Sequence, residues 1–78
     1  MKSQISTTLK RLRKSKNISI DEVVQFFIQN NKSVSGKTIY GWESGVSYPK
    51  LDNFLLLCEL YEIKDVVGIF KSKPKKIG

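Results

Sequence analysis

Apolar residues recur every three or four positions along most of the chain, a spacing typical of helices that bury one face. No stretch alternates apolar and polar residues in the way a half-buried strand does. The pattern predicts helices at residues 5–15, near 20–30, at 35–44, from about 49 to 61 and at 65–70. We therefore expect an all-α domain of five helices with short links, built around one small core.

Residues that start or stop helices mark several of these boundaries. Ser19 is predicted to cap the second helix, and Glu22 three residues later completes a capping box. Ser35 is a good N-cap for the third helix, and Gly45 is a good left-handed stop for it. Pro49 fits the first turn of the fourth helix.

The helix at residues 35–44 has two different faces. Ile39 and Trp42 are three residues apart and face one way, so they can enter a core. The opposite stripe holds Lys37, Tyr40, Gly41 and Ser44, which are polar or small and carry one positive charge. A slim polar face of this kind suits a DNA major groove, although an ordinary amphipathic helix with a solvated face has the same pattern.

The other helices each carry an apolar stripe that we expect to face the core. The expected inward residues are Ile5, Leu9, Leu12, Ile20, Val23, Val24, Phe27, Leu51, Phe54, Leu55, Cys58 and Tyr61. Leu56, Leu57 and Leu60 widen the apolar arc of the fourth helix beyond the needs of one small core. These three leucines are either a dimerisation surface or further core, and the last helix is the other candidate for a dimer contact.

Charge is distributed unevenly along the 78 residues, which have a formal net charge of +7. Residues 1–19 contain six basic residues and no acidic one, whereas residues 20–63 carry a net −3 and residues 64–78 a net +4. Basic ends around a mildly acidic middle suit a polyanionic partner, or serve only solubility. The lysine-rich segment 71–78 lacks apolar periodicity, so we expect a disordered basic tail after a domain at residues 1–70.

The composition offers little chemistry to an enzyme. The chain has no histidine and one cysteine, Cys58, so it lacks the residues for a metal site, an internal disulfide or a nucleophile–base pair. No apolar run approaches the length of a membrane span, and the polar N-terminus does not resemble a signal peptide. We expect a cytoplasmic protein with no enzymatic activity, no cofactor and no small-molecule substrate.

Three segments together resemble a known family. The capped run Ser19-Ile-Asp-Glu-Val, the run Val34-Ser-Gly-Lys-Thr-Ile-Tyr-Gly-Trp-Glu-Ser-Gly45 and Pro49-Lys-Leu are similar to the Cro and phage-repressor (XRE-type) helix-turn-helix proteins. The variant that ends in Tyr-x-Trp-Glu-x-Gly is common in Gram-positive bacteria. The resemblance covers roughly residues 5–70 and implies a five-helix lambda-repressor-like DNA-binding domain. The segments near 20–30 and 35–44 would be its helix-turn-helix pair, with the second as recognition helix.

The resemblance also implies roles for individual residues. A structural ion pair falls on Arg13 and Glu43. Base-facing positions fall on Gly36, Lys37, Tyr40 and Gly41. Phosphate-facing positions fall on Ser19, Ser35, Ser44, Ser47, Tyr48 and Lys50.

The sequence departs from the family pattern at three places. Ile20 stands where the class often has a glutamine that touches the DNA backbone, and an isoleucine side chain cannot hydrogen bond. Gly36 and Gly41 offer no side chain to the bases, which leaves direct readout to Lys37 and Tyr40. The stretch 28–33 is about five residues longer than the commonest spacing, so either the second helix gains a turn or the link is a true loop.

The resemblance and the charge together indicate a sequence-specific DNA-binding transcriptional regulator, expected to be a repressor. It would place the helix at residues 35–44 in the major groove of double-stranded DNA and act as a homodimer, because one recognition helix covers few base pairs. Two alternatives remain open: the N-terminal DNA-binding domain of a longer regulator, and a protein-interaction module on a helix-turn-helix fold.

Overall fold

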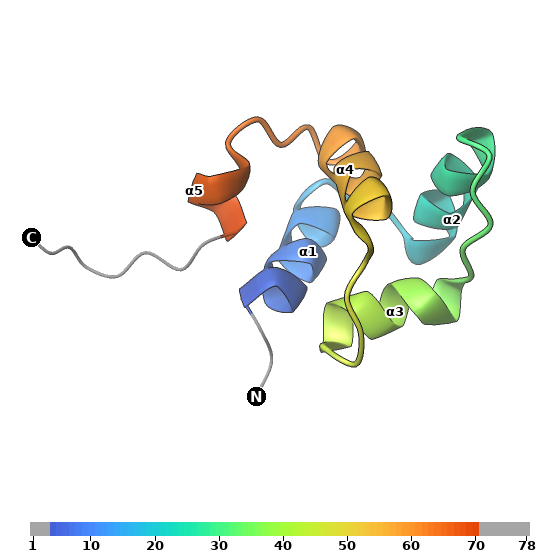
Figure 1. Ribbon diagram of the computed structural model, residues 1–78, viewed down its shortest axis with the longest axis horizontal. Coiled ribbons are helices and arrows are strands. Elements are labelled where there is room, and N and C mark those ends of the chain that lie inside the picture. The colour runs from blue at the N-terminus through green and yellow to red at the C-terminus, as the bar shows by residue number, and fades with distance from the viewer. Residues whose placement is uncertain (1–3, 71–78) are drawn as a thin grey trace, which may run out of the picture.

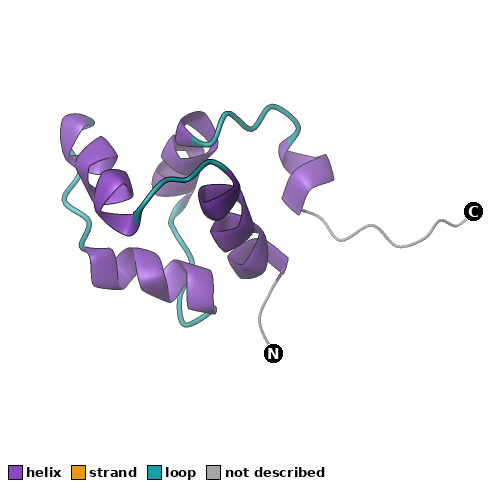
Figure 2. Ribbon diagram, turned by 180° about the vertical axis from the view of Figure 1, so that it is seen from behind, coloured by secondary structure: helices purple, strands orange, loops and turns teal. Residues whose placement is uncertain are grey.

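Five helices make up the computed structural model, which describes residues 4–70 (Figures 1 and 2). In chain order they are α1 (Gln4–Ser15), α2 (Ile20–Gln29), α3 (Gly36–Ser44), α4 (Leu51–Leu60) and α5 (Val66–Phe70). No strand occurs among these described residues, so the predicted all-α architecture is confirmed for them. The basic tail predicted at residues 71–78 lies outside the described residues.

Side-chain caps fix where α2 and α3 begin. The Ser19 hydroxyl accepts from the Glu22 N–H at 3.1 Å, and the Ser19 N–H donates to the Glu22 carboxylate at 2.7 Å. This is the predicted capping box, and it occupies two backbone donors that a helix start leaves free. The Ser35 hydroxyl accepts from the Thr38 N–H at 3.1 Å in the same way. Pro49, expected inside the first turn of α4, instead precedes the N-cap Lys50.

The first four helices all end in the same manner, with one residue in the left-handed conformation. These residues are Asn17 (φ 57°), Asn31 (φ 61°), Gly45 (φ 87°) and Glu62 (φ 57°). The N–H of the next residue donates to the carbonyl five positions back, as in Ile18 to Arg13 (3.1 Å), Lys32 to Phe27 (2.9 Å), Val46 to Gly41 (3.0 Å) and Ile63 to Cys58 (2.9 Å). This Schellman-type ending satisfies carbonyls that the helix leaves open. It also ends α2 at Gln29, so the long link before α3 is a true loop.

The core draws side chains from all five helices. Its buried apolar members are Leu9, Val23, Phe27, Ile39, Trp42, Leu57, Cys58, Tyr61 and Phe70. The rings of Phe27 and Trp42 join α2 to α3 with centroids 5.9 Å apart, and Phe54 and Phe70 join α4 to α5 at 5.0 Å. Burial raises the pKa of the Cys58 thiol, as expected for a small packed side chain rather than a reactive one.

The structure corrects the predicted inward face of α4. Leu57 is only 1% exposed and belongs to the core, whereas Leu51 and Leu55 are 72% and 54% exposed. Phe54, Leu57, Cys58 and Tyr61 follow the i, i+3, i+4, i+7 spacing of one helix face. Leu57 is therefore not available as a dimer surface, and the exposed leucines of α4 are Leu51 and Leu55.

Candidate nucleic-acid interface

The helix α3 lies along one edge of the molecule, packed against α1 and α2 (Figures 1 and 2). Ile39, Trp42 and Glu43 are its buried residues. Its other side exposes Lys37 and Tyr40, and the Tyr40 side chain is 60% exposed. Lys37 and Tyr40 of the predicted polar stripe thus face solvent, Gly41 and Ser44 are half-buried, and the opposite side of the helix is fixed in the core.

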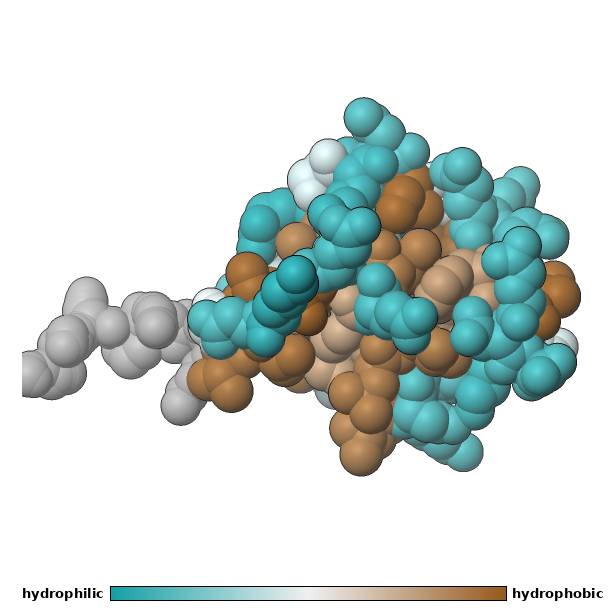
Figure 3. Space-filling model, turned by 90° about the horizontal axis from the view of Figure 1, so that it is seen from above, coloured by the Kyte–Doolittle hydropathy of each residue, from teal (hydrophilic) through white to brown (hydrophobic). Residues whose placement is uncertain are grey.

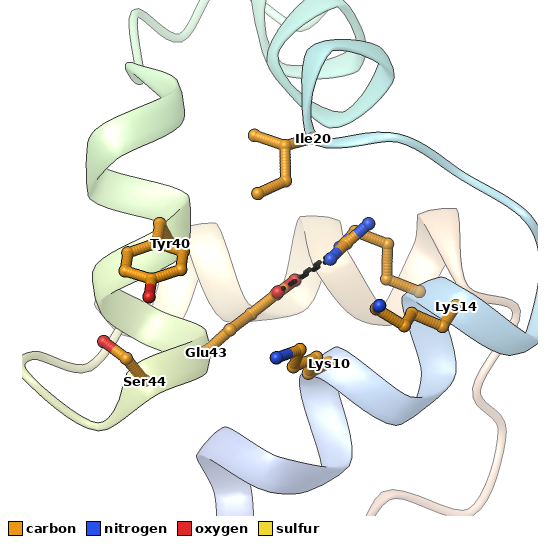
Figure 4. Close-up of a pocket in the computed structure, with 7 residues that line it drawn as sticks. Lys10, Lys14, Ile20, Tyr40, Glu43 and Ser44 are labelled. Carbon is orange, nitrogen blue, oxygen red and sulfur yellow. Dashed lines mark hydrogen bonds and ion pairs between the residues drawn. The ribbon is translucent and has the colours of Figure 1, made fainter.

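An ion pair ties the end of α3 to α1 (Figure 4). The Arg13 Nε donates to Glu43 Oε2 at 2.7 Å and Nη2 donates to Oε1 at 3.1 Å, so the carboxylate is held in a bidentate fork. A third donor of Arg13, Nη1, reaches the Ile18 carbonyl at 2.9 Å. The side chains are 11% and 4% exposed, and the hydrogen bond to Glu43 raises the pKa of Arg13. The structure thus brings together the two residues that the resemblance implied as a structural pair.

Two of the four base-facing candidates are glycines with a packing role. A Cβ on Gly36 would lie 3.3 Å from Cγ2 of Ile20, so the start of α2 lies against the start of α3 there. A Cβ on Gly41 would lie 3.2 Å from the Ser47 hydroxyl oxygen, which belongs to the link after α3. Both glycines are half-buried, so only Lys37 and Tyr40 offer exposed side chains among the four.

Three of the four serines predicted to face phosphates are engaged in local hydrogen bonds. Ser19 and Ser35 accept backbone N–H groups as N-caps, and the Ser44 hydroxyl donates to the Gly41 carbonyl at 3.3 Å. A hydroxyl that accepts one N–H retains its own hydrogen, so Ser19 can still donate to a phosphate oxygen. The Ser35 hydroxyl also forms a 3.1 Å hydrogen bond with the Thr38 hydroxyl, so it can donate to a phosphate when Thr38 is the donor of that bond. These two caps lie near each other, because Ile20 contacts Gly36.

The other phosphate-facing candidates lie in the link between α3 and α4. Ser47 and Lys50 are exposed, and the Lys50 side chain makes no capping hydrogen bond. Tyr48 is exposed too, but it lines an apolar hollow of about 180 Å³ with Ile5, Pro49, Leu51 and Phe54. Tyr48 therefore belongs to a different surface from Lys37 and Tyr40.

The sequence places Lys10, Arg11 and Lys14 off the core stripe of the first helix, where one or two of them could reach phosphates, but it does not indicate that Lys10 and Lys14 lie beside α3. Lys10 and Lys14 of α1 line a hollow that Tyr40 and Ser44 also line. Their i, i+4 spacing around Arg13 was the available signal, because residues three or four apart share a helix face. The two lysines fall more than twenty residues before Tyr40 and Ser44, so only the fold brings these side chains together.

The described residues contain no group of three histidine, cysteine, aspartate or glutamate side chains that could hold a metal ion. Within residues 4–70, no helix has both the length and the apolar character needed to cross a membrane. A scan against protein-family models and searches of curated proteins and solved structures found no match to this chain.

Proposed function

We propose that this chain is a sequence-specific DNA-binding transcriptional regulator of the helix-turn-helix class, with a lambda-repressor-like arrangement of its helices. The helix pair would be α2 and α3, with α3 in the major groove. One observation carries the proposal: α3 is fixed by Ile39, Trp42 and the Arg13–Glu43 pair on one side and exposes Lys37 and Tyr40 on the other. A helix that reads bases needs such an anchored back and an open polar front.

The dimensions of α3 support this use. Its nine residues span about 13 Å, and an α-helix with side chains is about 10–12 Å in diameter. The B-DNA major groove is about 12 Å wide, so a helix lying on an edge of the protein can enter it. The half-buried Gly36 and Gly41 add no side chains beside the exposed Lys37 and Tyr40.

Base readout would rest on Lys37 and on the ring of Tyr40. A lysine ammonium can donate to the guanine O6 and N7 acceptors, and a good pair of this kind discriminates by about 1–3 kcal/mol. Backbone phosphates would be contacted by the capping hydroxyls of Ser19 and Ser35 and by the exposed Lys50. Such contacts position the protein without reading sequence.

A homodimer is part of the proposal, because a single recognition helix covers few base pairs. The surface over α4 and α5 exposes apolar side chains among hydrophilic ones (Figure 3). Leu51, Leu55 and Val67 are the exposed large apolar residues of these two helices. We expect sedimentation to show a concentration-dependent dimer that the double variant Leu51→Lys/Leu55→Lys weakens. A wild-type monomer at near-millimolar concentration would contradict the dimer.

The test of DNA binding is an NMR titration of the full chain with a random-sequence duplex at low and then at higher salt. We expect amide shifts centred on residues 19–21, 35–41 and 44–50 that fade steeply as salt rises, because phosphate contacts release counterions. Shifts confined to the lysine-rich tail, or no shifts at all, would contradict the proposed interface.

Base readout is tested by selecting a preferred site from a random pool and comparing Lys37→Ala with wild type. We expect the ratio of specific to non-specific affinity to fall about 5- to 150-fold, which corresponds to about 1–3 kcal/mol. Lys64→Ala is the matched control, because it removes an exposed lysine outside the interface. If Lys37→Ala and Lys64→Ala had the same ratio of specific to non-specific affinity, Lys37 would not contribute to base readout.

One observation favours a second candidate function, a protein-interaction module. The apolar hollow between Ile5, Tyr48 and Leu51 could receive an apolar side chain of a partner protein. In that case Lys37→Ala would leave partner binding unchanged, whereas Tyr48→Ala would weaken it.

A further inference from the structure

A second hollow, of about 220 Å³, lies between α1, the start of α2 and the second half of α3 (Figure 4). Lys10 and Lys14 extend into it from α1, and Tyr40 and Ser44 lie across from them on α3. Ile20 supplies an apolar wall, and the Arg13–Glu43 pair lies between the two sides. The volume of this hollow is large enough to admit a phosphate group.

The charge in this hollow is unbalanced. Both carboxylate oxygens of Glu43 accept from Arg13, so that pair is neutral overall. The ammonium groups of Lys10 and Lys14 form no ion pair or hydrogen bond with any residue between 4 and 70. The hollow therefore holds two uncompensated ammonium groups on one face of α1, which repel each other until an anion lies between them.

Hydroxyl groups on α3 complete the donor set. The Tyr40 hydroxyl has no hydrogen-bond partner within the described part of the chain, and Figure 4 shows it on the same side of α3 as Ser44. An anion held by two ammonium groups and a phenol hydroxyl would be contacted from two helices at once.

We propose that this hollow seats a phosphate of the DNA backbone, bound by Lys10, Lys14 and the Tyr40 hydroxyl. The inference rests on the proposed function and adds α1 to the DNA-contacting elements. A backbone phosphate fits better than a free ion, because the ammonium groups lie at an open surface beside the exposed side of α3. An open site of this kind holds a phosphate well only when the rest of the duplex is bound alongside it.

The start of α2 explains why a phosphate would be held from α1. The Ile20 side chain cannot donate a hydrogen bond, and the next two residues, Asp21 and Glu22, are acidic and exposed. Carboxylates at that position weaken the phosphate contact that Ser19 would make there, so a stronger contact would come from another element. The lysines of α1 approach from the other side of Ile20, and neither acidic residue lines the hollow.

The test compares two double variants that each remove two positive charges. Lys10→Gln/Lys14→Gln empties the proposed seat, and Arg11→Gln/Lys64→Gln removes exposed charges that do not line the hollow. Duplex affinity is measured across a range of salt concentrations for both variants, for wild type and for Lys10→Arg/Lys14→Arg. Thermal unfolding of each variant controls for folding.

We expect the Lys10→Gln/Lys14→Gln variant to lose one phosphate contact. The slope of log K against log salt should then become shallower by about 0.9, and affinity at about 0.1 M salt should fall about eightfold. The control pair should change affinity less than twofold at an unchanged slope. The arginine pair should retain wild-type affinity within about twofold, because it keeps both charges.

The outcomes separate this inference from the proposed function. If wild type binds the duplex and both charge-removal variants lower the duplex affinity equally, the phosphate site in the hollow is wrong, whereas the proposed DNA binding is supported. If wild type does not bind a duplex even at low salt, the proposed function fails and the seat fails with it. Inorganic phosphate is the second probe, and saturable amide shifts at Lys10 and Lys14 in the low-millimolar range would overturn the DNA seat in favour of a free-anion site.

Discussion

The helices α3 and α4 are of similar length but are held in the fold in different ways. Buried Ile39 and Trp42 fix α3, and the Arg13–Glu43 ion pair fastens its end to α1. The helix α4 is fixed by an apolar stripe that includes Leu57 and Cys58, and it has no buried charge. A buried ion pair depends on both partners and on their orientation, whereas an apolar stripe tolerates some rotation. The orientation of α3, the proposed recognition helix, is thus set by the directional hydrogen bonds of the Arg13–Glu43 pair.

The strongest test of this difference is Glu43→Ala. The change leaves the Arg13 guanidinium largely buried without its partner, so we expect the free energy of unfolding to fall by about 3–5 kcal/mol. Urea denaturation followed by circular dichroism measures it. Glu59→Ala is the matched control on α4, because Glu59 is exposed, and it should change stability by less than about 0.5 kcal/mol. A loss below about 1 kcal/mol for Glu43→Ala would show that the pair does not hold α3.

The corresponding test on α4 compares two leucines two positions apart. Leu57→Ala removes a side chain that is 1% exposed, and we expect a loss of about 2–5 kcal/mol from lost burial and the cavity left behind. Leu55→Ala removes an exposed side chain and should change stability by less than about 0.5 kcal/mol in the monomer. Chemical denaturation at low protein concentration separates the two variants. Equal losses would mean that α4 is rotated relative to the described fold.

The same contrast explains what the sequence could predict. Apolar residues are sparse in α3, so Ile39 and Trp42 defined its buried side, and Ser35 and Gly45 defined its ends. In α4 apolar residues occupy most positions, so several rotations satisfied the pattern and the wrong leucines were assigned to the core. Hydrogen-bonding caps and stops act locally and could be identified from neighbouring residues, whereas the rotation of α4 depends on the helices packed against it.

The candidate site also combines residues that helix spacing could group with residues that only the fold brings together. Lys37 and Tyr40 share a face of one helix, so spacing alone was enough to group them. Lys10 and Lys14 line the same hollow as Tyr40 only because α1 packs beside α3, and no local sequence pattern encodes that packing. The reason for glycine at position 36 likewise lies in Ile20, on another helix.

Substitution of Gly41 tests whether the fold of α3 requires a glycine at this position. Alanine is favoured over glycine inside a helix by about 1 kcal/mol, but the new Cβ would meet the Ser47 hydroxyl at 3.2 Å. Ser47 is exposed and its side chain can rotate, so we expect Gly41→Ala to stabilise the fold by up to about 0.5–1 kcal/mol. Thermal unfolding measures this gain, and Gly41→Ala/Ser47→Ala should gain more than the single variant. A destabilised double variant would show that α3 cannot accept a methyl group there.

The smallest effect concerns a surface contact that joins the loop before α3 to the start of α4. Lys32 forms an ion pair with Asp52 and donates a hydrogen bond to its carboxylate. This hydrogen bond is the main cause that lowers the pKa of Asp52 below 3.8. A second hydrogen bond, from the Asn53 N–H at 2.9 Å, lowers that pKa further. Because the pKa of Asp52 is lower in the folded state, its ionised carboxylate stabilises the fold at pH values above the unfolded-state pKa. This stabilisation is lost as the pH falls through the folded-state pKa. Lys32→Ala should therefore raise the Asp52 pKa toward 3.8 in an NMR titration, and only part of the way, because the Asn53 N–H remains. Lys64→Ala should leave this titration unchanged, and an unchanged pKa in Lys32→Ala would mean that the loop is not held to α4 by this pair.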